Sequence, residues 1–191
     1  MCSSDLYDVM LSQLNYLAGA WLNAGEAPTR FALSSHPYIV PAQIFPTADG
    51  WLTLFITHDQ FWQKFCGEVG RLEWTVDPRF ASMGSRRANR EHVLAAITGV
   101  LAGDTASGWV KRLEPLGVVV AEICTLDAAL SSGLAASRDM VVHLGEPALG
   151  LRGIGSPIKF SDFTPAYGPP PLLDQHHAQI LQLGQDAAHG A

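Results

Sequence analysis

The chain has 191 residues, of which 48% are hydrophobic and 16% are charged, and its formal net charge is −6. This length can bury a sizeable core, and the composition is typical of a soluble globular protein, so we expect a cytoplasmic protein with reduced thiols. The 12 Lys and Arg are scattered among 18 acids, which excludes a nucleic-acid-binding footprint, and no apolar run reaches the ~20 residues that a membrane span needs.

The chain opens with a predicted helix. Apolar residues at helical spacing predict one helix over residues 6–22, which Gly25 and Pro28 then end. Only a short polar leader precedes this helix. We therefore expect that the reading frame is truncated and that the protein continues upstream of Met1.

A proline-rich segment and a strand come next. Four prolines lie within residues 23–50 and favour an extended crossing linker, because each proline biases the residue before it away from helical backbone. Asp49-Gly50 predicts a turn and Trp51–Ile56 a strand. Thr57 and Gln60 have the spacing of a capping box, which predicts that a helix starts there.

The middle of the chain is predicted to be helical up to a second strand. Helices are expected from Thr57 to Gly70, over residues 85–101 and from Thr105 or Ser107 onward. The β-branched run Val118–Ile123 predicts a buried strand.

The last third of the chain alternates short elements. Short helices are expected at 126–131 and just before Arg138, followed by a strand pair, Met140–Leu144 with Leu151–Ile154. A final amphipathic helix is predicted over Gln175–Leu183. Because helices and strands mix without strict alternation, the fold class is α+β.

Familiar catalytic motifs are absent from the sequence. We find no phosphate-binding loop, nucleophile elbow, His-Glu-x-x-His or Cys-x-x-Cys pattern. The three cysteines are far apart and predict neither a disulfide nor a metal site. The adjacent His176 and His177 point about 100° apart on a helix, which favours surface histidines over metal ligands. His36 precedes a proline in an extended segment, so both packing and substrate contact remain open for it.

The acidic and tryptophan residues have structural explanations. Asp49 belongs to a turn, Asp59 to a helix start and Asp77 to an Asp-Pro turn. The five tryptophans fall mostly on apolar faces, so core packing is expected for them.

Several segments, taken in order, resemble the family III CoA-transferases, also called the CaiB/BaiF family. The resembling segments span nearly the whole chain: Asp8–Leu11, His36-Pro37, Gln43–Gly50, Asp77–Phe80, Arg87, Asn89-Arg90, Trp109, Leu116–Val118, Arg138–Val142, Gly155–Ser161, Pro171–Leu173 and His176.

The resemblance implies an architecture. It implies a Rossmann-like α/β large domain built from both chain ends, a small α+β domain between them, and an interlocked homodimer of the full-length protein. On this template residues 1–44 are the helix and crossover linker of the large domain, residues 45–145 the small domain, and residues 146–191 the return to the large domain. Asp174 stands where the family often has glycine, which puts a positive φ at that position in doubt.

The resemblance also implies a reaction. These enzymes move CoA between an acyl-CoA and a carboxylic acid, with coenzyme A as substrate and no cofactor or metal, through an anhydride formed on an aspartate. That aspartate lies upstream of the family's equivalent of Asp8, so no catalytic residue is assigned and the chain alone is expected to be inactive. His36, Tyr38 and Gln43 are the candidate substrate-binding residues.

Two alternatives remain open. A 2-methylacyl-CoA racemase would share the fold, but its acid–base pair would also lie upstream. A non-catalytic dimerisation or binding module is the third reading. No nucleic-acid or membrane partner is expected.

Overall fold

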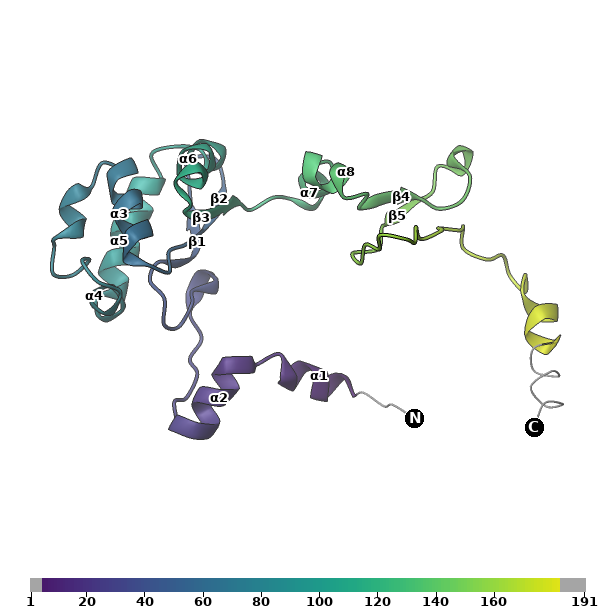
Figure 1. Cartoon of the computed structure of the whole chain (residues 1–191), viewed down its shortest axis with the longest axis horizontal. Helices are drawn as coiled ribbons and strands as arrows, with labels where there is room; N and C mark the ends of the chain where they lie inside the picture. The colour runs from purple at the N-terminus through teal and green to yellow at the C-terminus, as the bar shows by residue number, and fades with distance from the viewer. Residues whose placement is uncertain (1–4, 183–191) are drawn as a thin grey trace. The chain divides into compact units, whose positions relative to one another are not determined.

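The structure, a computed structural model, describes residues 5–182 and divides the chain into two units, one ending at Ile123 and one beginning at Cys124 (Figure 1). Residues 1–4 of the predicted polar leader, with Cys2, and the C-terminal tail from residue 183 onward lie outside the described residues. The domain boundary expected near residue 145 stays a prediction.

The first unit is built on a three-stranded antiparallel sheet in the order β1-β2-β3. Its strands are β1 (Ala42–Pro46), β2 (Trp51–Phe55) and β3 (Val119–Glu122). β1 and β2 form a hairpin in which Ala42 faces Phe55, and the Thr47 amide closes the turn by donating to the Gly50 carbonyl at 2.9 Å. The Asp49-Gly50 turn and the second strand were predicted, whereas β1 had been assigned to the linker.

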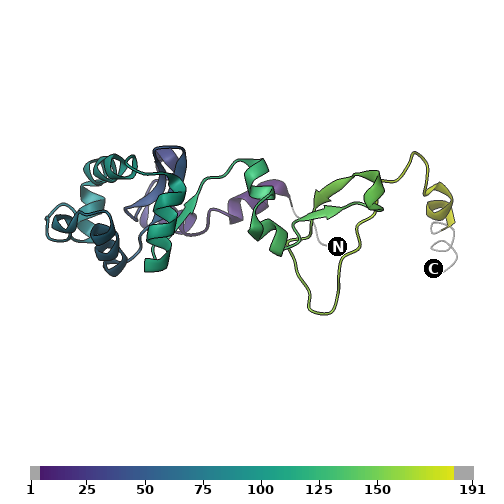
Figure 2. The ribbon, with the colours of Figure 1, turned by 90° about the horizontal axis from the view of Figure 1, so that it is seen from above.

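Helices pack against this sheet and complete the core (Figures 1 and 2). They are α3 (Asp59–Glu68), η2 (Leu72–Thr75), α4 (Met83–Ala88), α5 (Arg90–Leu101), α6 (Ala106–Leu113) and η3 (Glu114–Leu116). The side chains that form the buried cluster come from the end of the linker and from the elements that follow it in this unit: Val40, Phe45, Leu52, Leu54, Ile56, Trp62, Phe65, Cys66, Trp74, Phe80, Val93, Ile97, Leu101, Ala106, Trp109, Leu113 and Val118.

Tryptophans supply part of this core. The rings of Trp62 and Trp74 stack at 6.0 Å between centroids, and Phe80 stacks on Trp74 at 5.1 Å. Trp109 is also buried, but Trp21 and Trp51 are about half exposed. Core packing therefore holds for three of the five tryptophans. Burial raises the pKa of the Cys66 thiol to about 12, which makes this cysteine a core residue without thiolate character.

Arg86 carries a buried charge in this core, with 0% of its surface exposed. Its guanidinium donates to the carbonyls of Val40 and Phe80 at 2.9 Å each and to the Asp59 carboxylate at 2.8 Å. It also lies 4.7 Å from the centre of the Trp62 ring. Each of the three guanidinium nitrogens thus has an acceptor, and Arg86 joins the linker, the loop at Phe80 and the start of α3.

Two predicted helices are each broken in two. The helix expected over residues 6–22 is α1 (Leu6–Ser12) followed by α2 (Asn15–Ala24), and α2 ends at a left-handed Gly25 as predicted. The Ser12 hydroxyl donates back to the Val9 carbonyl, and Asn15 takes a φ of 45°, which Asn tolerates better than most residues. These local bonds compete with a continuous helix.

The second break separates α4 from α5 at Asn89, within the helix expected over residues 85–101. The Asn89 side-chain amide donates to the Ser85 carbonyl at 2.9 Å. The main-chain amide of Asn89 donates to the same oxygen, so the side chain helps to end the helix there.

The predicted caps had mixed outcomes. Thr105 caps α6 as expected, because its hydroxyl accepts from the Gly108 amide at 3.0 Å. The capping box at Thr57 was wrong, since α3 begins one residue later with His58 as N-cap and without a side-chain cap bond.

The predicted strand after α6 exists, but it is not buried. β3 pairs only with β2, at the edge of the sheet, and Val119 is 59% exposed, whereas Val118 just before the strand is 3% exposed. A β-branched run predicts extended backbone but does not report whether a second layer covers it.

The second unit contains the predicted short elements. Helices α7 (Leu126–Leu130) and α8 (Gly133–Ser137) precede an antiparallel pair, β4 (Val141–His143) with β5 (Arg152–Ile154). The turn between these strands is η4 (Pro147–Leu149). These positions agree with the sequence analysis, and so does the α+β class.

The C-terminal part of the second unit holds a last helix, over residues 177–182 as far as the structure describes it. Asp174, just before it, takes a φ of 64°, so the positive φ is retained without glycine. His176 and His177 are exposed, as expected, and His177 lies 3.0 Å from the Asp174 carboxylate.

Across residues 5–182, no single helix is both long and apolar enough to cross a membrane. One pair, Arg90–Leu101 with Ala106–Leu116, passes on length and composition but is bent by 105°. In both of its helices, α5 and α6, one face lies in the core.

Candidate functional site

A pocket of about 310 Å³ lies where the linker reaches the hairpin of the first unit. Two of the three candidate substrate-binding residues, His36 and Gln43, line it, and Tyr38 lines a neighbouring pocket of about 300 Å³. The two pockets share Ser35 and Pro37. The structure therefore places all three predicted residues along one stretch of surface.

The linker positions His36 through its own backbone. The His36 amide donates to the Ala42 carbonyl at 2.8 Å, which folds the chain back at the start of β1. The ring atom Nδ1 then accepts from the amides of Tyr38 and Ile39, at 3.1 Å each. One side chain thus satisfies two amides of a tight turn, as Asn or Asp does in an Asx turn.

Aromatic residues surround the His36 ring. Tyr16 of α2 stacks on it at 5.8 Å between centroids, and its hydroxyl lies 3.0 Å from Nε2. Tyr38 and Phe55 approach edge-on, at 6.2 and 6.1 Å. Burial, followed by the positive charge of Arg90, lowers the pKa of His36, so the ring is neutral at physiological pH.

Arg90 of α5 holds this part of the linker in place. Its guanidinium donates to the Ser35 hydroxyl at 2.8 Å and to the carbonyls of His36 and Pro37 at 2.9 and 2.7 Å. It also lies 4.6 Å from the centre of the Phe31 ring. From the sequence Arg90 is named only among the segments that resemble the family, because nothing local predicts which carbonyls a side chain will reach.

Tyr38 is already engaged by neighbours. Its hydroxyl donates to the Glu26 carboxylate at 2.9 Å, and this bond is the main cause that raises the pKa of Tyr38. The guanidinium of Arg87 lies 5.0 Å from the centre of its ring. Tyr38 therefore borders the second pocket with its polar atom occupied.

Gln43 differs from Tyr38 in that no described residue bonds to its polar side-chain atoms. It is only 7% exposed, it lies on β1, and it lines the first pocket. Among the described residues its side-chain amide has no hydrogen-bond partner. A carboxamide offers two donors and an acceptor, so Gln43 keeps its polar atoms available to a ligand.

Three aspartates of the first unit, Asp49, Asp59 and Asp77, have structural partners. Asp49 accepts from the Ala106 amide at the start of α6 at 2.8 Å, and Asp59 pairs with Arg86. Asp77 pairs with Arg79 at 2.6 Å, and the hydrogen bonds from Arg79 lower the pKa of Asp77 to about 2. Within the described part of the chain no group of three or more His, Cys, Asp and Glu residues could hold a metal ion.

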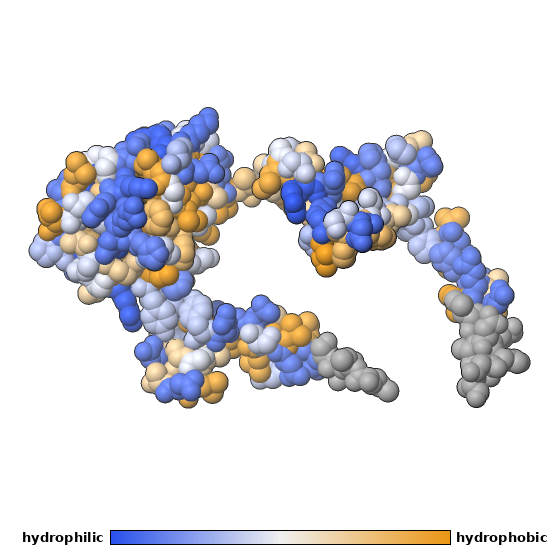
Figure 3. Space-filling view, in the orientation of Figure 1, coloured by the Kyte–Doolittle hydropathy of each residue, from blue (hydrophilic) through white to orange (hydrophobic). Residues whose placement is uncertain are grey.

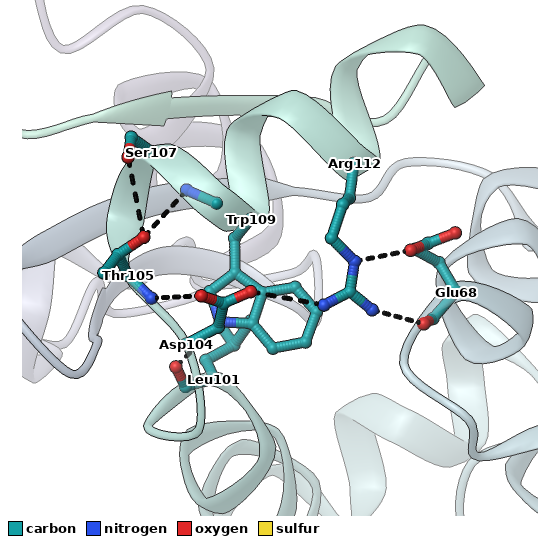
Figure 4. A network of polar contacts seen from close by, with 8 residues as sticks. Glu68, Leu101, Asp104, Thr105, Ser107, Trp109 and Arg112 are labelled. Carbon is teal, nitrogen blue, oxygen red and sulfur yellow. Dashed lines mark hydrogen bonds and ion pairs between the residues drawn. The ribbon is translucent and has the colours of Figure 1, made fainter.

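A second polar cluster, centred on Arg112 of α6, serves the fold (Figure 4). Its guanidinium donates to the Glu68 carboxylate at 2.6 Å and to the Glu68 carbonyl at 2.9 Å, and it pairs with Asp104 at 3.3 Å. It also lies 4.4 Å from the centre of the Trp109 ring. Each charge has a partner inside the cluster. We therefore interpret the cluster as a structural link between α3, α6 and the loop before α6.

Sequence comparison gives a consistent result. The family model of CoA-transferase family III matches residues 1–177. An acyl-CoA transferase of Fusarium pseudograminearum is 32% identical over 189 residues, covering 96% of this chain and 41% of that protein. The acetyl-CoA:oxalate CoA-transferase of Acetobacter aceti is 27% identical over 177 residues, covering 92% of this chain and 44% of that protein.

Solved structures agree with the sequence match. The crystal structure of a CaiB/BaiF family protein from Brucella suis superposes with a TM-score of 0.77 at 27% identity, covering 93% of this chain and 46% of that one. The chain thus spans less than half the length of these relatives. The match over most of its residues shows that the chain belongs to CoA-transferase family III.

Proposed function

We propose that this chain is the C-terminal portion of an enzyme that moves CoA between an acyl-CoA and a carboxylic acid. The observation that carries the proposal is the family match over residues 1–177, which includes the linker and the hairpin that form the pocket. His36, Tyr38 and Gln43 are proposed to form part of the surface that receives the acyl or acid portion of the substrates.

The proposed chemistry proceeds through an aspartate. Its carboxylate attacks the thioester carbonyl, CoA leaves as the thiolate, and an anhydride joins the acyl group to the enzyme. The CoA thiolate then attacks the aspartyl carbonyl of this anhydride, which releases the first acid and leaves CoA as a thioester on the aspartate. The carboxylate of the second acid attacks that thioester and releases CoA again, and the thiolate finally attacks the new acyl carbonyl, which forms the product acyl-CoA and frees the aspartate. We assign no residue of this chain as the nucleophile, and the structural pairing of Asp49, Asp59 and Asp77 supports this choice.

We further propose that residues 45–145 act as the small domain and that the full-length protein is an interlocked homodimer. Apolar side chains on α1 and α2 lie on the surface of the chain, as Figure 3 shows, and support an extensive interface. Leu6, Met10 and Leu22, for example, are 78%, 62% and 77% exposed.

The test uses the native protein, purified from its source with an antibody against this chain. Incubation with acetyl-CoA and oxalate, or with succinyl-CoA and glutarate, is followed by mass spectrometry of the CoA esters. We expect a new acyl-CoA of the acceptor acid and none without the acceptor.

The alternatives predict different products. Exchange of the α-proton of a 2-methylacyl-CoA in D₂O, without CoA transfer, would replace the transferase with a racemase. Native protein that performs neither reaction at saturating donor would support the non-catalytic module.

A further inference from the structure

The contacts of His36 determine which of its ring nitrogens holds the proton. Nδ1 accepts from two backbone amides, so it has no hydrogen of its own. A neutral imidazole carries one proton, which must then be on Nε2. The only polar partner of Nε2 in the described chain is the Tyr16 hydroxyl at 3.0 Å, so His36 donates and Tyr16 accepts.

This direction leaves the Tyr16 hydroxyl proton without a partner. A phenol that accepts a hydrogen bond still has its own O–H to donate. In the described part of the chain the hydroxyl has no second contact, and Tyr16 lines the same pocket as His36 and Gln43. Accepting a hydrogen bond also polarises the O–H, which strengthens its donation.

Gln43 provides an independent second donor at this pocket. More than nine-tenths of its surface is buried, and its carboxamide is unpartnered in the described chain. Among the described residues the buried side-chain polar atom that lacks a partner is Trp62 Nε1, so the carboxamide atoms of Gln43 still reach the solvent in the pocket and stay available to a ligand. Arg90 donates to the linker carbonyl of His36 and adds positive potential, while none of the described residues that line the pocket carries a carboxylate.

We propose that Tyr16 is a substrate-binding residue whose hydroxyl, together with the Gln43 carboxamide, donates to a carboxylate or thioester oxygen, and that His36 is a positioning residue. His36 orients the Tyr16 hydroxyl through its fixed tautomer and does not itself touch the ligand. The ligand class rests on the proposed function, whereas the tautomer and the donor pair rest on the geometry.

The first test is nuclear magnetic resonance on the 191-residue chain labelled with ¹⁵N-histidine. Long-range ¹H–¹⁵N spectra distinguish a protonated from an unprotonated ring nitrogen. We expect His36 to carry its proton on Nε2, both in the wild type and in Tyr16→Phe, because the backbone amides select the tautomer. A proton on Nδ1 would overturn the proposal.

The second test is titration with oxalate, with sodium chloride at equal ionic strength as the control for unspecific anion effects. We expect oxalate to shift the Gln43 side-chain amide and to bind roughly tenfold more weakly to Tyr16→Phe, because a hydrogen bond to a charged group is lost. Tyr7→Phe is the matched control, since Tyr7 is 69% exposed on α1 and does not line this pocket.

Thermal unfolding of both variants checks that the fold is retained. Equal oxalate affinity in Tyr16→Phe and wild type, or no specific binding to the wild type, would overturn the donor pair. Specific oxalate binding without CoA transfer by the native protein would leave the donor pair standing and remove the transferase, so the two failures are distinguishable.

Discussion

His36 combines a structural and a chemical role in one side chain. Its Nδ1 completes a backbone turn that an Asn could also complete, and its Nε2 orients a phenol. From the sequence, packing and substrate contact are both open for this residue. The observed contacts favour packing for His36 itself and assign the proposed ligand contact to Tyr16.

His36 is expected to make stability depend on pH. Its folded pKa lies below the ordinary 6.5, so the unfolded chain binds the proton first as the pH falls, and protonation would turn Nδ1 into a donor facing two amides. The stabilisation is therefore complete above pH 6.5 and is lost as the pH falls through the lowered pKa.

The comparison variant is His36→Asn, which keeps an acceptor for the turn but does not titrate. The free energy of unfolding of both proteins is measured with urea from about pH 8 to about pH 5. The difference in favour of the wild type should be smallest at the acid end. A difference between the two proteins that stays constant with pH would contradict this expectation.

Arg86 shows how a charged residue becomes part of a core. Its sequence neighbourhood, with Arg87 and Arg90, resembles a small surface patch. In the fold, Arg86 is buried, Arg90 holds the linker and Arg87 lies against Tyr38. Three arginines that are close in sequence thus lie in three different environments.

Replacing Arg86 by Met should lower the free energy of unfolding by about 2–4 kcal/mol, because two buried carbonyls lose their donor. Asp59 is half exposed and can return to water, which limits the loss. Arg71→Met is the control: Arg71 is exposed and pairs with Glu73 at 3.7 Å, so we expect a change within about 0.5 kcal/mol. Similar urea midpoints for the two variants would refute the role of Arg86.

At the scale of elements, a helix start can be predicted where a side chain acts on its own backbone, as at Thr105, although the caps at Ser82 and Ser132 were not predicted. Thr105 meets this condition, and its environment adds a constraint that sequence does not reveal: a Cβ on Gly108 would lie 2.7 Å from the Asp104 carboxylate. The start of α6 is therefore constrained both by the Thr105 cap and by Asp104, which belongs to the Arg112 cluster.

Thr105→Ala should cost about 1 kcal/mol, the usual value of an N-cap, while Thr105→Ser should retain most of the stability because its hydroxyl can still accept from the Gly108 amide. Thermal denaturation followed by circular dichroism measures both variants. Equal losses in the two would indicate that the Thr105 methyl group, and not the cap, stabilises this region.

At the scale of the whole molecule, the two units differ in how much they bury. The buried cluster lies entirely before Ile123. Between residues 124 and 182, Gly155 is the only residue classed as buried. Apolar burial is the main stabilising term in folding, so the units should differ in local stability.

Hydrogen–deuterium exchange should reveal this difference. Amides of β2, α3 and α5 are expected to exchange slowest, and those of β4 and β5 to exchange much faster, because their hydrogen bonds are not backed by a core. Comparable protection in β4 and β2 would show that the second unit is stabilised by contacts beyond its own residues.

The sequence by itself determined the family, the α+β class and most element positions. It did so because helical periodicity, Asp-Gly turns and hydroxyl caps are local, and because the family segments occur in order along the chain. His36 and Gln43 could also be named as candidates, since an extended segment that runs into a turn and a strand is predictable from its prolines and from Asp49-Gly50.

Only the tertiary structure decided which side chains meet. The breaks at Gln13 and Asn89, the exposure of β3, the burial of Arg86 and the contact of Tyr16 with His36 depend on groups that are distant in sequence or compete with regular helix. Hydrogen bonding between such groups depends on three-dimensional packing, and this packing produces no periodic pattern in the sequence. The direction of the His36–Tyr16 bond, and with it the proposed donor, therefore emerges only from the folded geometry.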